Sequence, residues 1–169
     1  MKRLKSLDLS SVYLYPGAIY IAEEPTMVTT VLGSCVSVTM FSPVLQRGAI
    51  SHCTLPRCRF LNSCNDSCME TFKYVDCTLR HMLRHFRTLD VWNKDLEIKI
   101  FGGADTLQSK SSNTIGTQNV KSALDVIKAE KLRVIAADVG DSFGRKVLFL
   151  SHTGEVFVKR LKKSNGNSI

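Results

Sequence analysis

Cys35 and His52 are the residues whose types and spacing most directly suggest chemistry. The stretch TTVLGSCVSV, residues 29–38, places a cysteine after Gly33-Ser34, and a histidine follows seventeen positions later in GAISHCTLP. A catalytic cysteine needs a base, because the thiolate is the reactive form and an ordinary thiol titrates near ~8.5. Glycine before the thiol permits a tight turn that aims backbone N–H groups at one point. A buried structural thiol is the alternative, since free cysteine is among the most buried residue types.

A nucleophilic Cys–His pair also needs a group that orients the imidazole. Thr29 and Thr30 both precede the cysteine, on the β-like segment next to it in the sequence. Adjacent residues of a strand point to opposite faces, so only one of them can serve the histidine.

The elements that must position these residues follow from hydrophobic periodicity. Short runs rich in apolar and β-branched residues, separated by turn signals, predict antiparallel neighbouring strands in the first third of the chain. These runs are residues 18–23, 27–31, 35–41 and 48–55. Residues 96–104, 132–140, 145–150 and 155–161 predict further strands, with a hairpin turn at 152–155.

Two segments change to helical spacing. Apolar residues recur every three to four positions over roughly 69–89, and again over about 117–130, after a polar loop at 111–119. We therefore predict an α+β fold with two principal helices packed on mostly antiparallel β sheets. The chain reads as a single domain over residues 1–163, with a polar flexible tail at 164–169.

Charge and composition narrow the function classes. Lys and Arg number 23 against 15 Asp and Glu, a formal net charge of +8. This balance favours an acidic partner. Aromatic residues do not alternate with the basic ones as a single-strand nucleic-acid platform requires, so we expect no nucleic acid. Neither a signal peptide nor a membrane-crossing run is visible, and we expect a cytoplasmic protein without membrane insertion.

Six cysteines are many for a cytoplasmic chain. Their spacing matches no recognised zinc or iron–sulfur pattern, so we expect no metal. A metal site and a redox role that caps Cys35 remain alternatives to unremarkable thiols. The cysteines besides Cys35 whose roles stay open are Cys53, Cys58, Cys64, Cys68 and Cys77.

Three other features have plain structural interpretations. Gly102-Gly103 reads as a strand end where backbone segments approach closely, not as a phosphate loop. Asp138 and Arg145 suggest a buried pair or a loop anchor. His81 and His85 suggest a solvated basic helix face, although their spacing also suits metal ligands.

The motifs TTVLGSCVSVTMFSP and GAISHCTLP resemble the signature of the CheD family of chemoreceptor glutamine deamidases. KYVDCTLRHML, LEIKIFGGADTL, NTIGTQNV, ADVGDSFGRKVLF and TGEV follow in the family's order, so that the resemblance covers roughly residues 14–162. The fold it implies is that of CheD and of the catalytic domains of cytotoxic necrotizing factors.

The resemblance implies roles for particular residues. Cys35 matches the family nucleophile, His52 its base, and Thr29, six residues before the cysteine, its triad threonine. Gly33 and Ser34 would supply backbone support for the oxyanion. The implied reaction hydrolyses glutamine side chains on the cytoplasmic helices of methyl-accepting chemotaxis receptors through a thioester, releasing ammonia and using no cofactor.

Two departures from the family pattern concern loops. Gln118 precedes Asn119 where the family often has arginine, and Asp141 stands where it often has a second glycine. Both positions are expected in surface loops. The alternative function is a non-catalytic chemotaxis adaptor that binds a CheC-type phosphatase or receptors, since family members also bind that phosphatase.

Overall fold

The computed structural model describes residues 9–59, 71–107 and 111–162. Nine strands in these ranges form two sheets. The first has the order β1-β3-β8-β9 and the second the order β2-β5-β4-β6-β7. The strands are β1 (Ser10–Tyr13), β2 (Ala18–Ile21), β3 (Thr26–Leu32), β4 (Val36–Ser42), β5 (Arg47–His52), β6 (Glu97–Gly102), β7 (Arg133–Val139), β8 (Gly144–Leu150) and β9 (Val156–Leu161).

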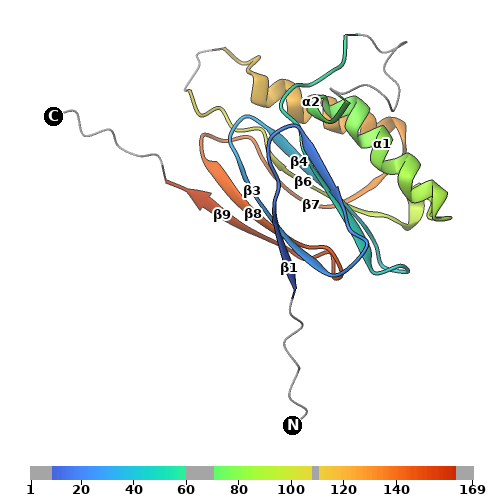
Figure 1. Ribbon diagram of the computed structural model, residues 1–169. Coiled ribbons are helices and arrows are strands. Elements are labelled where there is room, and N and C mark those ends of the chain that lie inside the picture. The colour runs from blue at the N-terminus through green and yellow to red at the C-terminus, as the bar shows by residue number, and fades with distance from the viewer. Residues whose placement is uncertain (1–8, 60–70, 108–110, 163–169) are drawn as a thin grey trace.

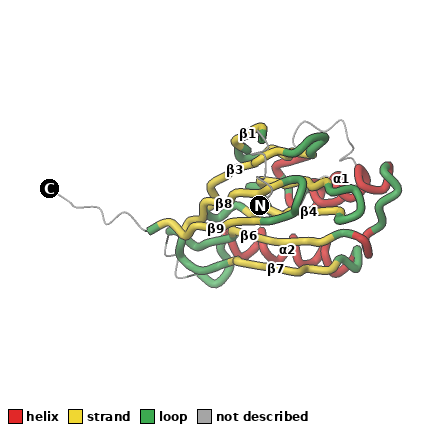
Figure 2. The backbone as a smooth tube through the Cα atoms, turned by 90° about the horizontal axis from the view of Figure 1, so that it is seen from below, coloured by secondary structure: helices red, strands yellow, loops and turns green. Residues whose placement is uncertain are grey.

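The molecule has three layers. Helices α1 (Val75–Thr88) and α2 (Ile115–Ala129) cover one face of the five-stranded sheet, and the four-stranded sheet lies on its other face (Figure 1). Seen at right angles, β1 and β3 lie on the side of the molecule opposite to β7 (Figure 2). The predicted α+β class, with two helices on mostly antiparallel sheets, is confirmed. Two strand pairs, β1 with β3 and β6 with β7, are parallel.

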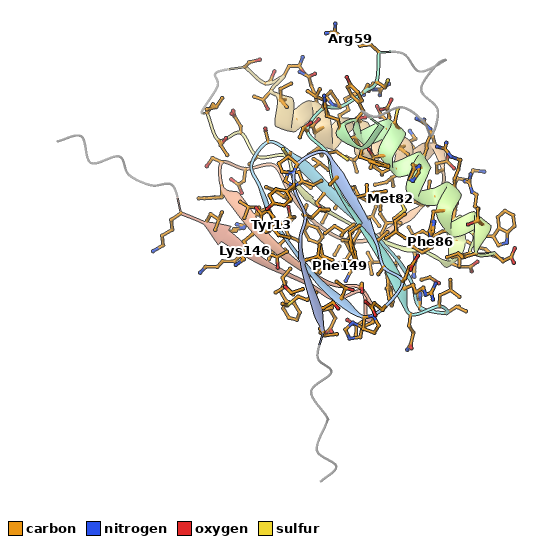
Figure 3. The ribbon with its side chains drawn as sticks, in the orientation of Figure 1. Tyr13, Arg59, Met82, Phe86, Lys146 and Phe149 are labelled. Carbon is orange, nitrogen blue, oxygen red and sulfur yellow. The ribbon has the colours of Figure 1, made fainter. Side chains whose placement is uncertain are left out.

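Two apolar cores fill the spaces between the layers. The larger lies between the helices and the five-stranded sheet, and Met82 and Phe86 of α1 belong to it. The smaller lies between the two sheets and contains Phe149. Figure 3 shows Phe149 inside the molecule, whereas the side chain of Lys146, the third residue of β8, points outward. Each residue of β4, the central strand of the five-stranded sheet, is buried and therefore faces one core or the other.

The predicted helix bounds were wrong at their N-termini. The helix predicted over 69–89 becomes α-helical only at Val75, because Lys73 accepts backbone hydrogen bonds from Thr54 and Leu55 and Tyr74 is extended. Residues 69–70 of that prediction lie outside the described ranges. The second helix begins at Ile115, inside the predicted loop, because the Thr114 side chain caps it by accepting a hydrogen bond from Thr117 N.

Strand β1 was not predicted from the sequence. It is a short edge strand of mostly exposed residues, so it carries no clear alternating pattern. Its pairing with β3 places Tyr13 beside Thr29 and brings the following residue, Leu14, to the smaller core. The predicted turn at 152–155 between β8 and β9 is confirmed.

Candidate active site

The three residues Gly33, Ser34 and Cys35 carry the chain from one sheet to the other. Strand β3 of the four-stranded sheet ends at Leu32, and β4 of the five-stranded sheet begins at Val36. Cys35 is half-buried and packs against the core between the sheets. The crossing therefore brings the thiol to the edge of the inter-sheet space, where it keeps some access to solvent.

All three carbonyl groups of this crossing loop accept a hydrogen bond from a donor outside it. The bonds are Ala104 N to Gly33 O (2.9 Å), Asn119 Nδ2 to Ser34 O (2.9 Å) and Gly103 N to Cys35 O (2.8 Å). A trans peptide is planar, so the N–H of one residue points opposite to the carbonyl of the residue before it. The N–H groups of Ser34 and Cys35 therefore point away from Ala104 and Asn119.

Gly102 and Gly103 make this close approach of backbones feasible. Gly102 has a φ of +100°, and a Cβ there would lie 2.2 Å from the carbonyl oxygen of Cys35. Gly103 has a φ of +66°, and its Cβ would lie 2.2 Å from Val120 Cγ2. Both positions exclude a side chain on conformational and steric grounds. The interpretation of this pair as a close-contact strand end is confirmed.

Asn119 is a site residue that sequence reasoning missed. It is fully buried on α2, and its Nδ2 donates to Ser34 O and to Thr54 O at 3.2 Å. The expectation of a surface loop at 118–119 was wrong for this residue. Asn119 precedes the buried Ala123 and Val126 by four and seven positions, so helical periodicity places it on the apolar face. That spacing is the signal that could have found it.

The strand register places Cys35 and His52 on the same face of the five-stranded sheet. Val36 and Cys53 are directly paired in antiparallel fashion and belong to the helix-side core. Their preceding neighbours, Cys35 and His52, therefore point to the opposite face, between the sheets. The two side chains are diagonal neighbours, a relation across which longer side chains interact.

His52 is buried, with 1% of its surface exposed, and its ring is fixed by one hydrogen bond. Its Nδ1 lies 2.7 Å from Thr30 Oγ1, which in turn donates to the Leu14 carbonyl oxygen at 2.7 Å. A hydroxyl has only one hydrogen to donate. Because that hydrogen goes to Leu14, Nδ1 must carry the ring proton. The assignment leaves Nε2 with a free lone pair, and Nε2 has no hydrogen-bond partner.

The threonine that is hydrogen-bonded to this histidine is Thr30, whereas the family resemblance implies Thr29 as the triad threonine. Thr30 is fully buried and faces the same core as Val28 and Leu32, whereas Thr29 is half-buried on the outer face of the sheet. The expectation that the two threonines point to opposite faces was sound. A residue count from the cysteine does not tell which face of β3 meets the second sheet, and it is Thr30 that faces that sheet.

Burial shifts the two reactive groups in opposite directions. Desolvation raises the pKa of the Cys35 thiol, and a hydrogen bond from its own backbone N–H offsets part of that rise. Desolvation lowers the pKa of His52, and the nearby Leu14 carbonyl offsets part of that fall. Burial disfavours whichever form is charged. The resting pair is therefore a neutral thiol and a neutral imidazole near pH 7.

The remaining cysteines differ from Cys35. Cys53 is fully buried, and burial raises its pKa to about 12 despite hydrogen bonds from Thr78 and Ser51. Cys58 is buried and Cys77 half-buried. Cys64 and Cys68 lie outside the described residues. Within residues 9–59, 71–107 and 111–162, no group of three or more acidic, histidine or cysteine side chains is arranged to hold a metal ion.

Asp138 and Arg145 form an ion pair that anchors a loop, as the sequence suggested, but only Arg145 is fully buried and Asp138 is partly exposed. Arg145 has no exposed surface and donates to Asp138 Oδ1 at 2.9 Å. It also donates to the carbonyl oxygens of Gly140 and Phe143. The hydrogen bond from Arg145 holds the pKa of Asp138 below its usual range. This pair stabilises the β7–β8 connection.

Two surface hollows flank Ile115 at the start of α2. One, of about 300 Å³, is lined by Ser34 and by residues of the Ala104–Leu107 segment. The other, of about 860 Å³, is lined by Leu55 and Tyr74 and by the basic side chains of Arg57, Arg59 and Lys121. The smaller hollow opens beside the residue that precedes the thiol.

The structural class is an α+β protein with two stacked sheets. A cysteine, and a histidine that is hydrogen-bonded to a threonine, lie between these sheets. Residues 55–160 match the family model described as "CheD chemotactic sensory transduction", and the chain belongs to the CheD family. That match begins after Thr30, Cys35 and His52.

The sequence similarity to relatives also covers the part of the chain that contains Thr30, Cys35 and His52. The chain is 44% identical over 161 residues to the "Probable chemoreceptor glutamine deamidase CheD 2" of Geobacter sulfurreducens, covering 95% of this chain and 96% of that protein. It is 39% identical over 161 residues to the "Probable chemoreceptor glutamine deamidase CheD" of Maridesulfovibrio salexigens, covering 92% and 95%. A Shewanella oneidensis relative, named as a probable CheD 1 deamidase, is 33% identical over 98% of this chain.

Neither helix in the described ranges is long and apolar enough to cross a membrane.

Proposed function

We propose that this protein is a chemoreceptor glutamine deamidase that hydrolyses glutamine side chains to glutamate with Cys35 as nucleophile. The observation that carries the proposal is the hydrogen bond between Thr30 and His52 Nδ1, which leaves Nε2 as an unprotonated base on the face that holds Cys35. The substrate class comes from the names of relatives that are up to 44% identical. These two lines of support are independent, because one is the geometry of the site and the other is the sequence similarity to relatives.

The first half of the reaction acylates Cys35. His52 Nε2 takes the thiol proton, and the sulfur attacks the carboxamide carbon of the glutamine. When the tetrahedral intermediate collapses, His52 returns the proton to the amide nitrogen and ammonia leaves. The resting neutral pair suits this order, because proton transfer from thiol to imidazole then accompanies attack.

The second half hydrolyses the thioester. Water attacks the acyl carbon, His52 Nε2 takes its proton, and the carbon–sulfur bond breaks to release glutamate and the thiol. Neither half of this scheme calls for a metal or an organic cofactor.

Backbone N–H groups of Ser34 and Cys35 are the proposed oxyanion donors, with Gly33 providing the loop conformation. This proposal is supported by the three bound carbonyl groups of the crossing loop, which leave these N–H groups directed away from Ala104 and Asn119. Donors fixed in advance cost no reorganisation during the reaction, and one such donor is typically worth ~3 kcal/mol. The hollow lined by Ser34, the residue before the thiol, is the proposed entry for the glutamine side chain.

The proposed partners are the methyl-accepting chemotaxis receptors, whose cytoplasmic helices carry the substrate glutamines and place the reaction in the cytoplasm. A CheC-type phosphatase stays a predicted partner that rests on the family resemblance alone.

The proposal is tested by incubating the protein with a recombinant receptor cytoplasmic fragment. Peptide mass spectrometry then follows the small mass increase that converts a carboxamide to a carboxylic acid at each glutamine. Conversion by the wild type and none by Cys35→Ala is the expected result. Unchanged receptor with wild type, or equal conversion by the Cys35→Ala variant, would contradict the proposal.

A further inference from the structure

Ser37 is a buried hydroxyl that the proposed mechanism does not use. It lies on β4 with no exposed surface, and its Oγ has no hydrogen-bond partner. Ser51, a fully buried serine of the neighbouring strand β5, is satisfied: it accepts from Val38 N at 3.1 Å and donates to Val38 O. A buried polar group without a partner is costly and calls for an explanation.

The position of Ser37 is set by the register of β4 against β5. Thr39 pairs with Ile50, and Val36 pairs with Cys53, so the same register places Ser37 directly opposite His52. Directly opposed residues of an antiparallel pair have Cβ atoms roughly 4.5–5.5 Å apart. Alternation along β4 puts the Ser37 hydroxyl on the inter-sheet face, the face of Cys35.

Two polar atoms without partners therefore lie opposite each other beside the reactive thiol. His52 Nε2 and Ser37 Oγ are both buried, and neither has a hydrogen-bond partner. The residues around them belong to the apolar core that includes Ile50 and Phe101. Thr30 occupies the other ring nitrogen and so directs Nε2 away from itself. A small molecule that donates one hydrogen bond to each of these two atoms gives both of them a partner.

We propose that Ser37 Oγ and His52 Nε2 together hold the water that hydrolyses the thioester, an inference that rests on the proposed deamidase function. One hydrogen of the water goes to Nε2 and the other to Ser37 Oγ, which directs an oxygen lone pair at the acyl carbon. The oxygen–carbon bond forms as Nε2 takes the first proton. The carbon–sulfur bond then breaks, and the proton passes to the Cys35 sulfur.

Competition between water and hydroxylamine tests this role directly. Wild type and Ser37→Ala are incubated with a receptor cytoplasmic fragment and a fixed concentration of hydroxylamine, and mass spectrometry gives the ratio of glutamyl hydroxamate to glutamate. Hydroxylamine is nucleophilic without a positioned base, so it depends less on Ser37. We expect the ratio to rise about tenfold in Ser37→Ala, the effect of one lost hydrogen bond to the attacking water.

Hydroxamate and glutamate both form from the acylated enzyme, so a variant that merely binds substrate poorly or acylates slowly leaves their ratio unchanged. Ser51→Ala is the matched control, because it removes a buried hydroxyl from the opposite face of the same strand pair; its ratio should equal that of wild type. Thermal unfolding confirms that each variant is folded.

The outcomes separate the two proposals. Absence of glutamate and hydroxamate with the wild type contradicts the deamidase function itself. Active wild type with the same ratio in Ser37→Ala, or with the same rise in Ser51→Ala, overturns the role of Ser37 alone.

Discussion

Cys35 and Cys53 lie at the ends of the adjacent strands β4 and β5, yet their environments give them different chemistry. Cys53 is bridged to Val36, and Cys35 is the residue before Val36. The Val36–Cys53 pair turns Cys53 toward the helix-side core, where burial raises its pKa to about 12. Cys35 points to the other face, keeps partial exposure and receives a hydrogen bond from its own backbone N–H. The face of the sheet therefore decides whether a thiol packs or reacts.

Removal of each thiol gives the largest expected contrast. Cys35→Ala should lower the deamidation rate of a receptor fragment by at least about a thousandfold, because the proposed thioester forms on Cys35. Cys53→Ala should keep the rate within a few-fold of wild type, since Cys53 faces the other core. Product formation by mass spectrometry measures both. A comparable loss of rate in the two variants would contradict the distinction between the two faces of the five-stranded sheet.

The two threonines give the next contrast. Thr30→Val should lower kcat/KM by roughly a hundredfold, because His52 loses the partner that fixes its tautomer. Thr29→Val should have little effect, since Thr29 lies on the outer face of the sheet. Steady-state kinetics compares the variants, with Thr30→Ser as a control that keeps the hydroxyl. If Thr29→Val were the damaging change, the assignment of Thr30 would be wrong.

A smaller difference between Cys35 and Cys53 is expected in the pH dependence of their alkylation. A raised pKa means that the reactive thiolate forms only at higher pH, so alkylation of Cys35 by iodoacetamide should have its midpoint above the ordinary ~8.5. Cys53 should stay unmodified until still higher pH, given its pKa of about 12. Peptide mapping after timed alkylation gives both curves. A Cys35 midpoint clearly below ~8.5 would show a stabilised thiolate and contradict the neutral resting pair.

The smallest expected effect concerns the buried serines Ser37 and Ser51. Ser51→Ala should lower the free energy of unfolding by about 1 kcal/mol, because it removes hydrogen bonds to the Val38 backbone. Ser37→Ala should leave it unchanged or slightly higher, since an unpartnered buried hydroxyl is lost. Urea denaturation measures the difference. Equal losses would mean that Ser37 has a protein partner after all.

Several parts of this architecture could be predicted from local patterns. Alternation located most strands to within a few residues, and helical spacing located α1 and α2, because those periods follow from the geometry of each element. The nucleophile and base candidates came from residue type and spacing, together with the family resemblance. The unpredicted parts depend on distant partners: Leu14 reaches Thr30 through the pairing of β1 with β3, and Asn119 reaches Ser34 from α2.

By itself the sequence determined that Cys35, His52 and a threonine were available, and that Thr29 and Thr30 must face opposite ways. It also indicated the close backbone contact at Gly102-Gly103. Only the tertiary structure decided that Thr30 faces His52, that Cys53 faces the helices, and that Nε2 is the free nitrogen. The physical reason is that alternation fixes the relative direction of neighbouring side chains, whereas sheet stacking and long-range pairing fix which face meets the site.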